Sequence, residues 1–155
     1  FGFYISHPWV SPSTGFVFDR VQADACGKDS QGAYGHGTDD GLAWAWRLQE
    51  ILHYNGLNNK FYDKASVDVV TYALSRGRLV IMSTRLTKGG HLVLAKGYEV
   101  DAQDNIQFIV NDPYGDRNDP ESYGKKHNGA DVRYTWELLQ GDLSLPAKWM
   151  IEVLP

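Results

Sequence analysis

A histidine and an aspartate stand at the ends of two strands that the sequence predicts to be neighbours. The apolar run that begins at His91 and the run that ends with Asn111-Asp112 both have the composition of β-strands, and a polar turn joins them. The start of one strand lies beside the end of its antiparallel partner, so His91 and Asp112 should fall at the same end of the pair. An imidazole beside a carboxylate is the general base and orienting group of a nucleophilic triad, which then lacks only its nucleophile.

Two neighbouring side chains compete for the orienting role. Asn111 is an alternative to Asp112, because asparagine orients the base in some triads. Side chains alternate along a strand, so only one of the two can face His91. Both members of the predicted pair also have a purely structural interpretation, His91 as a histidine bonded within a turn and Asp112 as the first residue of an Asp-Pro-Tyr-Gly turn.

Cys26 is the single cysteine of the sequence, so the chain can form no internal disulfide. It is therefore either a structural thiol or a nucleophile. Reactive cysteines often lie at a helix N-terminus, where the helix dipole favours the thiolate. The glycine-rich segment 27–37 that follows Cys26 does not favour a helix. We expect Cys26 to close a helix or to lie in a loop, which argues against a nucleophilic role without excluding one.

Size and charge narrow the class of protein. A chain of 155 residues predicts one domain with its own core. The net charge of −4 and the lack of a basic block argue against a nucleic-acid partner, and no apolar run is long enough to predict a membrane span. Five tryptophans and nine tyrosines indicate either an aromatic core, which we favour, or a groove for sugar or peptide.

Four acidic residues, Asp112, Asp116, Asp119 and Glu121, raise the alternative of a calcium site in an adhesion domain. Their spacing matches no EF-hand, and a solvated acidic loop is the favoured interpretation. The histidines lack the zinc-binding H-E-x-x-H pattern. We therefore predict neither a metal nor a cofactor.

The predicted elements place helices before a sheet. Thr38–Asp40 predicts the start of a helix that runs to about Tyr54 and stops at Asn55-Gly56, and Ser66 predicts the cap of a second helix through Arg76. Strands are predicted at 79–83, 91–98, 106–110, 132–134 and 149–153, with one helical turn at 136–139. This order predicts an α+β domain with its helices on one side of a mostly antiparallel sheet.

The run from Ser66 to Gly115 resembles the C-terminal half of the bacteriocin-processing, double-glycine-peptidase-like cysteine peptidases of the papain-like superfamily. The motifs that carry the resemblance are Gly77–Ile81, Gly90-His91, Gly97-Tyr98-Glu99 and Asn111–Gly115. Leu79 replaces the usual proline, and Glu99 the usual aspartate. The similarity covers roughly residues 38–155, and its last part, Gly129–Thr135 and the Trp149 strand, is similar to stand-alone members found in phage lysins and secreted cell-wall enzymes.

The resemblance implies a single papain-like domain over residues 1–155, with N-terminal helices packed on the sheet, His91 as general base and Asp112 as its orienter. It implies a secreted or phage-associated cysteine peptidase that acts on a bacterial cell-wall peptide, or on a leader peptide, by a Cys-His-Asp mechanism. Peptide or peptidoglycan is then the expected partner. The alternative is a catalytically inactive papain-like module that binds peptide or cell-wall glycan.

The family's nucleophilic cysteine begins a helix that precedes the matching segment, after a glutamine that completes the oxyanion hole. Phe1-Gly2-Phe3 resembles the end of that helix. We therefore expect the nucleophile helix to lie upstream of residue 1. Two alternatives are a relative that has lost catalysis and a nucleophilic Cys26, which is followed by Gly27 as in the family motif.

Overall fold

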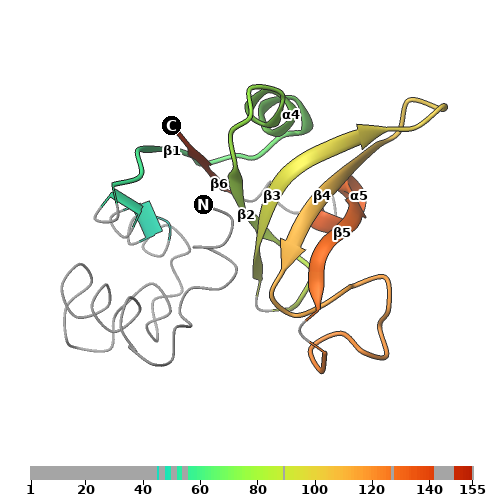
Figure 1. The fold of residues 1–155 in the computed structure, drawn as a ribbon. Helices are drawn as coiled ribbons and strands as arrows, with labels where there is room; N and C mark the ends of the chain where they lie inside the picture. Colours follow the sequence, from blue (N-terminus) through green and yellow to red (C-terminus); the bar gives the residue numbers. More distant parts are fainter. Residues whose placement is uncertain are drawn as a thin grey trace, which may run out of the picture.

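The computed structural model describes residues 56–88, 90–126, 128–141 and 149–154, together with Ala45, Leu48, Gln49, Leu52 and His53. Its centre is a six-stranded antiparallel sheet with the order β1-β6-β2-β3-β4-β5 (Figure 1). The strands are β1 (Asn59–Tyr62), β2 (Val80–Thr84), β3 (His91–Val100), β4 (Ile106–Asp112), β5 (Gly129–Thr135) and β6 (Met150–Val153). The helices α4 (Val67–Ser75) and α5 (Trp136–Gln140) complete an α+β fold, as the sequence predicted.

Helix α4 begins and ends where the sequence predicted. Ser66 has an extended backbone, and its hydroxyl accepts a hydrogen bond from the Val69 amide at 3.3 Å. Gly77, at φ +70°, follows the helix and donates its amide to the Leu74 carbonyl at 2.9 Å. The apolar face of the helix, Val70, Ala73 and Leu74, is buried against the sheet.

Both faces of the central strand β2 are covered. Its five residues are all buried, as expected for a strand that begins with the apolar run Val80–Met82. Val80 packs in the core cluster that contains the α4 face, whereas Ile81 packs in a second cluster with the helical residues Ala45 and Leu52. Helical residues therefore lie on both sides of the sheet, and the prediction of helices on one side alone was wrong.

Ala45, Leu48, Gln49, Leu52 and His53 are helical, and the predicted helix end at Tyr54–Asn55 lies outside the described residues. Gly56 has φ +77°, and the Leu57 amide donates to the Leu52 carbonyl at 2.9 Å. The predicted start of this helix at Thr38–Asp40 lies outside the described residues. The other predicted strands are present with ends shifted by a few residues, and β3, β4 and β5 are longer than predicted.

Strand β1 was not predicted, because Asn-Lys-Phe-Tyr is short and has no apolar alternation. It pairs with β6. The buried carboxylate of Glu152 on β6 accepts hydrogen bonds from a residue of β1 and from a residue just before β2. Glu152 is 3% exposed and accepts hydrogen bonds from Arg78 Nη1 at 2.6 Å and from the Tyr62 hydroxyl at 2.7 Å. Burial raises the pKa of Glu152, but the hydrogen bonds from Arg78 and Tyr62 outweigh burial and place the pKa below its ordinary value.

The Glu152 cluster should make the stability of the fold depend on pH. Because the pKa of Glu152 is lower in the folded state, its charge stabilises the fold above the unfolded-state pKa, and this stabilisation is lost as the pH falls through the folded-state pKa. Glu152→Gln should therefore lower the free energy of unfolding at neutral pH and flatten its decline below about pH 4.3. Urea unfolding across a pH series measures both effects.

Glu99→Gln is the matched control, because Glu99 and its partner Arg133 form an exposed ion pair. This variant should follow the wild-type pH profile closely. If the free energy of unfolding declines equally steeply below about pH 4.3 in wild type and in Glu152→Gln, Glu152 is not the source of the pH dependence.

Candidate active site

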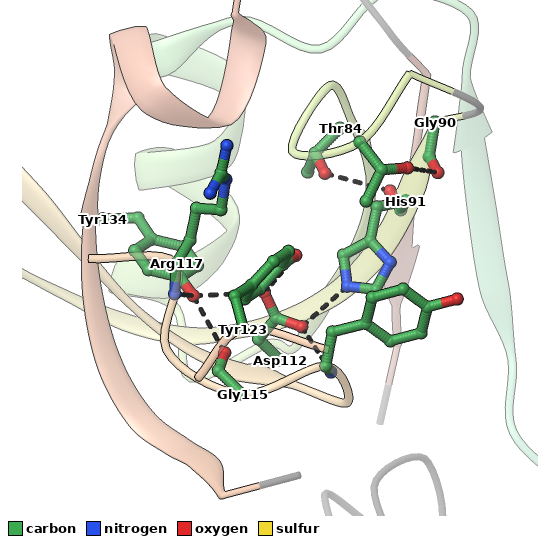
Figure 2. Close-up of polar contacts among 10 residues, drawn as sticks. Thr84, Gly90, His91, Asp112, Gly115, Arg117, Tyr123 and Tyr134 are labelled. Carbon is green, nitrogen blue, oxygen red and sulfur yellow. Dashed lines mark hydrogen bonds and ion pairs between the residues drawn. The ribbon is translucent and has the colours of Figure 1, made fainter. Parts of the chain in front are cut away.

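His91 and Asp112 are in direct contact, as the strand ends predicted (Figure 2). The imidazole Nε2 lies 2.7 Å from the carboxylate Oδ1. The His91 side chain is 7% exposed and that of Asp112 is fully buried. The two groups therefore form a close hydrogen-bonded pair that is shielded from water.

Strand alternation explains why the two side chains meet. Val93 and Ala95 face the α4-side core cluster, and His91 continues their row to the start of β3. In the same way, Asp112 ends the buried row of Phe108 and Val110 on β4. Both side chains consequently point to one face of the sheet.

The pairing register of β3 and β4 also brings the two side chains close together along the strands. Leu94 pairs with Asn111, so the same register continued to the strand ends sets Asp112 opposite Val93 and diagonal to His91. Diagonal neighbours on one face lie within reach of long side chains. Figure 1 shows this end of the sheet, where β3 begins, β4 ends and the long loop to β5 departs.

Asn111 faces away from His91. Its Oδ1 accepts a hydrogen bond from the Asp131 amide on β5 at 3.1 Å. Of the two orienting groups that the sequence left open, the structure therefore brings only Asp112 to the histidine. Asp112 is a turn residue as well, because its carbonyl accepts from the Gly115 amide at 3.2 Å.

Among the described residues, four groups donate hydrogen bonds to the Asp112 carboxylate. Oδ1 accepts the Tyr114 amide at 2.7 Å in addition to His91. Oδ2 accepts the hydroxyls of Tyr123 and Tyr134, each at 3.1 Å (Figure 2). Both oxygens of the buried charge are thus satisfied, as a buried carboxylate requires.

The sequence analysis did not find the two tyrosines. Tyr134 could have been found, since it alternates with Val132 on the inward face of β5. Tyr123 lies in a polar loop and carries no such signal. Burial chiefly, and then the neighbouring Asp112 charge, raise the pKa of both phenols well above its ordinary value. Both hydroxyls therefore keep their protons and donate to the carboxylate.

Aromatic rings shield the imidazole. The Tyr114 ring centroid lies 4.5 Å from that of His91, and the Tyr123 ring stands edge-on at 6.2 Å. Tyr114 is itself 45% exposed, so it forms the outer wall of the site. The His91 side chain keeps 7% of its surface exposed beside these two rings.

The turn before β3 fixes the backbone of His91. The Thr84 hydroxyl donates to the His91 carbonyl at 3.0 Å, and the Thr87 hydroxyl donates to the Gly90 carbonyl at 2.6 Å (Figure 2). Gly90 has φ +83°, a conformation that favours glycine and agrees with the predicted turn. The companion glycine at position 89 lies outside the described residues.

The geometry leaves one imidazole nitrogen for chemistry. When Nε2–H donates to Asp112, Nδ1 carries the lone pair, and no described residue bonds to Nδ1. Such a nitrogen can take a proton from a nearby thiol. Cys26, the thiol of the sequence, lies outside the described residues.

The carboxylates of Asp116 and Asp119 accept hydrogen bonds from neighbouring residues of their own loop. Asp116 Oδ1 accepts the Asn118 amide at 2.9 Å, and Asp119 Oδ2 accepts the Ser122 hydroxyl at 2.5 Å. Within the described ranges, no group of three or more His, Cys, Asp or Glu residues is placed to hold a metal ion. No helix in this part of the chain has the length and apolarity to cross a membrane.

The fold and the sequence place the chain among cysteine peptidase-type domains. Residues 18–142 match the model of the Peptidase_C39 like family. The match spans most of the chain and includes the His91–Asp112 pair, so the chain belongs to this family, whose papain-like architecture agrees with the α+β fold. No curated protein matches the chain significantly.

The packing of the loop after Asp112 can be tested at a glycine. A Cβ atom on Gly129 would overlap the carbonyl oxygens of Asp112 and Gly115. Gly129→Ala should therefore displace the Asp112 turn and lower the free energy of unfolding by about 1–3 kcal/mol. Gly97→Ala is the control, since its Cβ would meet Ile109 Cδ1 at an ordinary 3.6 Å. Equal unfolding free energies for the two variants in urea titrations would refute this account.

Proposed function

We propose that this domain hydrolyses peptide bonds by a Cys-His-Asp mechanism in which His91 is the general base and Asp112 orients it. The observation that carries the proposal is the buried 2.7 Å contact between Nε2 and Oδ1 in a chain of this family. This contact fixes the imidazole and leaves Nδ1 to a thiol.

The chemistry follows from the roles of the two ring nitrogens. Nδ1 of His91 takes the thiol proton, and the thiolate attacks the carbonyl carbon of the substrate. The Asp112 charge stabilises the imidazolium that forms. The imidazolium gives its proton to the amine that leaves as the C–N bond breaks, which yields the thioester. His91 then takes a proton from the attacking water, the C–S bond breaks to release the carboxylic acid, and the imidazolium returns the proton to the thiolate. Protons and bonds balance over the two steps, and no cofactor takes part.

The nucleophile has two candidate positions. Cys26 is the one thiol among these 155 residues, and the alternative is a cysteine on a helix encoded before Phe1. The same base and orienter serve either thiol. The proposal for His91 and Asp112 is therefore independent of this choice.

The proposed substrate is a bacterial cell-wall peptide or a leader peptide, and the proposed setting is secreted or phage-associated. The resemblance of Gly129–Thr135 and the Trp149 strand to stand-alone lysin domains supports the cell-wall substrate. A second candidate function, binding of peptide or glycan without catalysis, is favoured by the exposed ring of Tyr114 beside His91. The experiments below separate the two.

His91→Ala should lower kcat/KM for hydrolysis at least about 100-fold, because it removes the general base. Asp112→Asn should lower it by a similar factor by disturbing the imidazole orientation. The assay uses the full-length gene product with purified peptidoglycan and with a fluorogenic peptide library. His53→Ala, at an exposed helical position, is the matched control and should keep wild-type activity. A wild-type rate of hydrolysis in His91→Ala would contradict the proposed mechanism.

Thiol labelling locates the nucleophile. A cysteine paired with His91 should react with iodoacetamide below about pH 8, where an ordinary thiol is mostly protonated. We expect one such thiol in the full-length product, with labelling that is slowed in His91→Ala. Loss of the label in Cys26→Ser assigns the nucleophile to Cys26, and persistence of the label assigns it to another segment. If every thiol is labelled slowly and no hydrolysis is detected, the peptidase proposal is wrong and the binding module is the better account.

A further inference from the structure

We infer that Tyr123 is a positioning residue for the active site, whose hydroxyl holds the Asp112 carboxylate in the orientation that His91 requires. The inference rests on the proposed function, in which that orientation matters for the rate. The observation behind it is the set of hydrogen-bond donors around Asp112, which the sequence did not predict.

The two oxygens of Asp112 have separate partners. Oδ1 accepts from His91 and from the Tyr114 amide, and Oδ2 accepts from Tyr123 and Tyr134. Rotation of the carboxylate about its Cβ–Cγ bond would break the contacts on both oxygens together. The donors on Oδ2 therefore determine where Oδ1 points, although neither of them contacts the histidine nitrogen.

The two tyrosines are not equivalent donors. The Tyr134 oxygen lies 3.1 Å from both Asp112 Oδ2 and the Gly115 carbonyl, and it accepts the Arg117 amide at 2.6 Å. A hydroxyl has one proton, so Tyr134 divides it between two acceptors. Among the described residues, Tyr123 has a single acceptor, Asp112 Oδ2. Tyr123 is consequently the donor committed to the carboxylate.

Tyr123 also joins the β4–β5 loop to the histidine. Its ring stands edge-on to the His91 ring and tilted against the Tyr114 ring at 5.9 Å, and the Arg117 guanidinium lies 5.1 Å from its centroid. Its amide donates to the Asp119 carbonyl at 3.0 Å, which fixes the residue within a turn. Figure 2 shows the side chain between Arg117 and the Asp112–His91 pair. Order in this loop and orientation of the base are therefore coupled through one residue.

Tyr123→Phe isolates the hydroxyl, since phenylalanine keeps the ring and its contacts with His91, Tyr114 and Arg117. We expect kcat to fall between about 10-fold and 100-fold, the effect of a small misplacement of a catalytic group, with KM unchanged. Tyr72→Phe removes a hydroxyl from an exposed tyrosine on α4 and is the matched control with wild-type kinetics. Equal kcat values for Tyr123→Phe and Tyr72→Phe would overturn the inference.

A second measurement does not depend on activity. The Nε2–H proton of His91, held against Asp112 at 2.7 Å, should give a downfield proton NMR resonance, to be assigned by its absence in His91→Ala. We expect this resonance to broaden and exchange faster with water in Tyr123→Phe and to persist in Tyr72→Phe. A merely structural role of Tyr123 would lower the melting temperature and leave the resonance sharp, which would refute the inference. If the wild type lacks hydrolysis, the proposed function fails, and the resonance alone still decides the positioning role.

Discussion

The buried charge of Asp112 is the constraint on which this site depends. A carboxylate removed from water is strongly destabilising unless donors replace its hydration. At Asp112 the donors come from the start of β3, from the backbone of the following turn, from the β4–β5 loop and from β5. Each of these segments must be in place for the charge to be satisfied. The same set of contacts fixes the histidine, so the stability of this corner and the geometry of the pair have one cause.

The sheet determines where that charge can lie. Phe108 and Val110 are completely buried, and Asp112 occupies the next inward position of their row. Another apolar residue there would extend the core to the end of the strand. The aspartate instead ends the core with a polar group, beside a turn whose glycines allow close approach of the backbone. Gly129 in particular leaves room for the carbonyl oxygens of Asp112 and Gly115, which any side chain would displace. The long loop is therefore packed on the site and not merely attached to it.

The sequence predicted the His91–Asp112 contact because the contact follows from local rules. Two adjacent strands joined by a short turn pair antiparallel, and alternation with a period of two assigns each side chain to a face. The contacts of Tyr123 and Tyr134 follow from no such rule. Tyr123 reaches Asp112 through the path of an irregular loop, and Tyr134 through the pairing of β5 with β4. Likewise, β1 owes its place to its pairing with β6, far along the chain, and its own four residues show no strand pattern. Burial of both faces at β2 was already indicated by its apolar residues Val80–Met82, although the sequence analysis predicted helices on one face alone.

In the proposed mechanism, the choice of ring nitrogen constrains the position of the thiol. The lone pairs of Nδ1 and Nε2 point in divergent directions, so a thiol served by Nδ1 must approach His91 from the side of the ring away from Asp112. The histidine side chain is only 7% exposed, and Tyr114 and Tyr123 already occupy part of its surroundings. The thiol must therefore be presented by a segment that packs directly against this ring, and a cysteine in a loop that merely passes nearby would not suffice. Cys26 and a cysteine on a preceding helix are subject to the same requirement. A helix meets it more readily, because it holds the thiol rigidly and its dipole favours the thiolate.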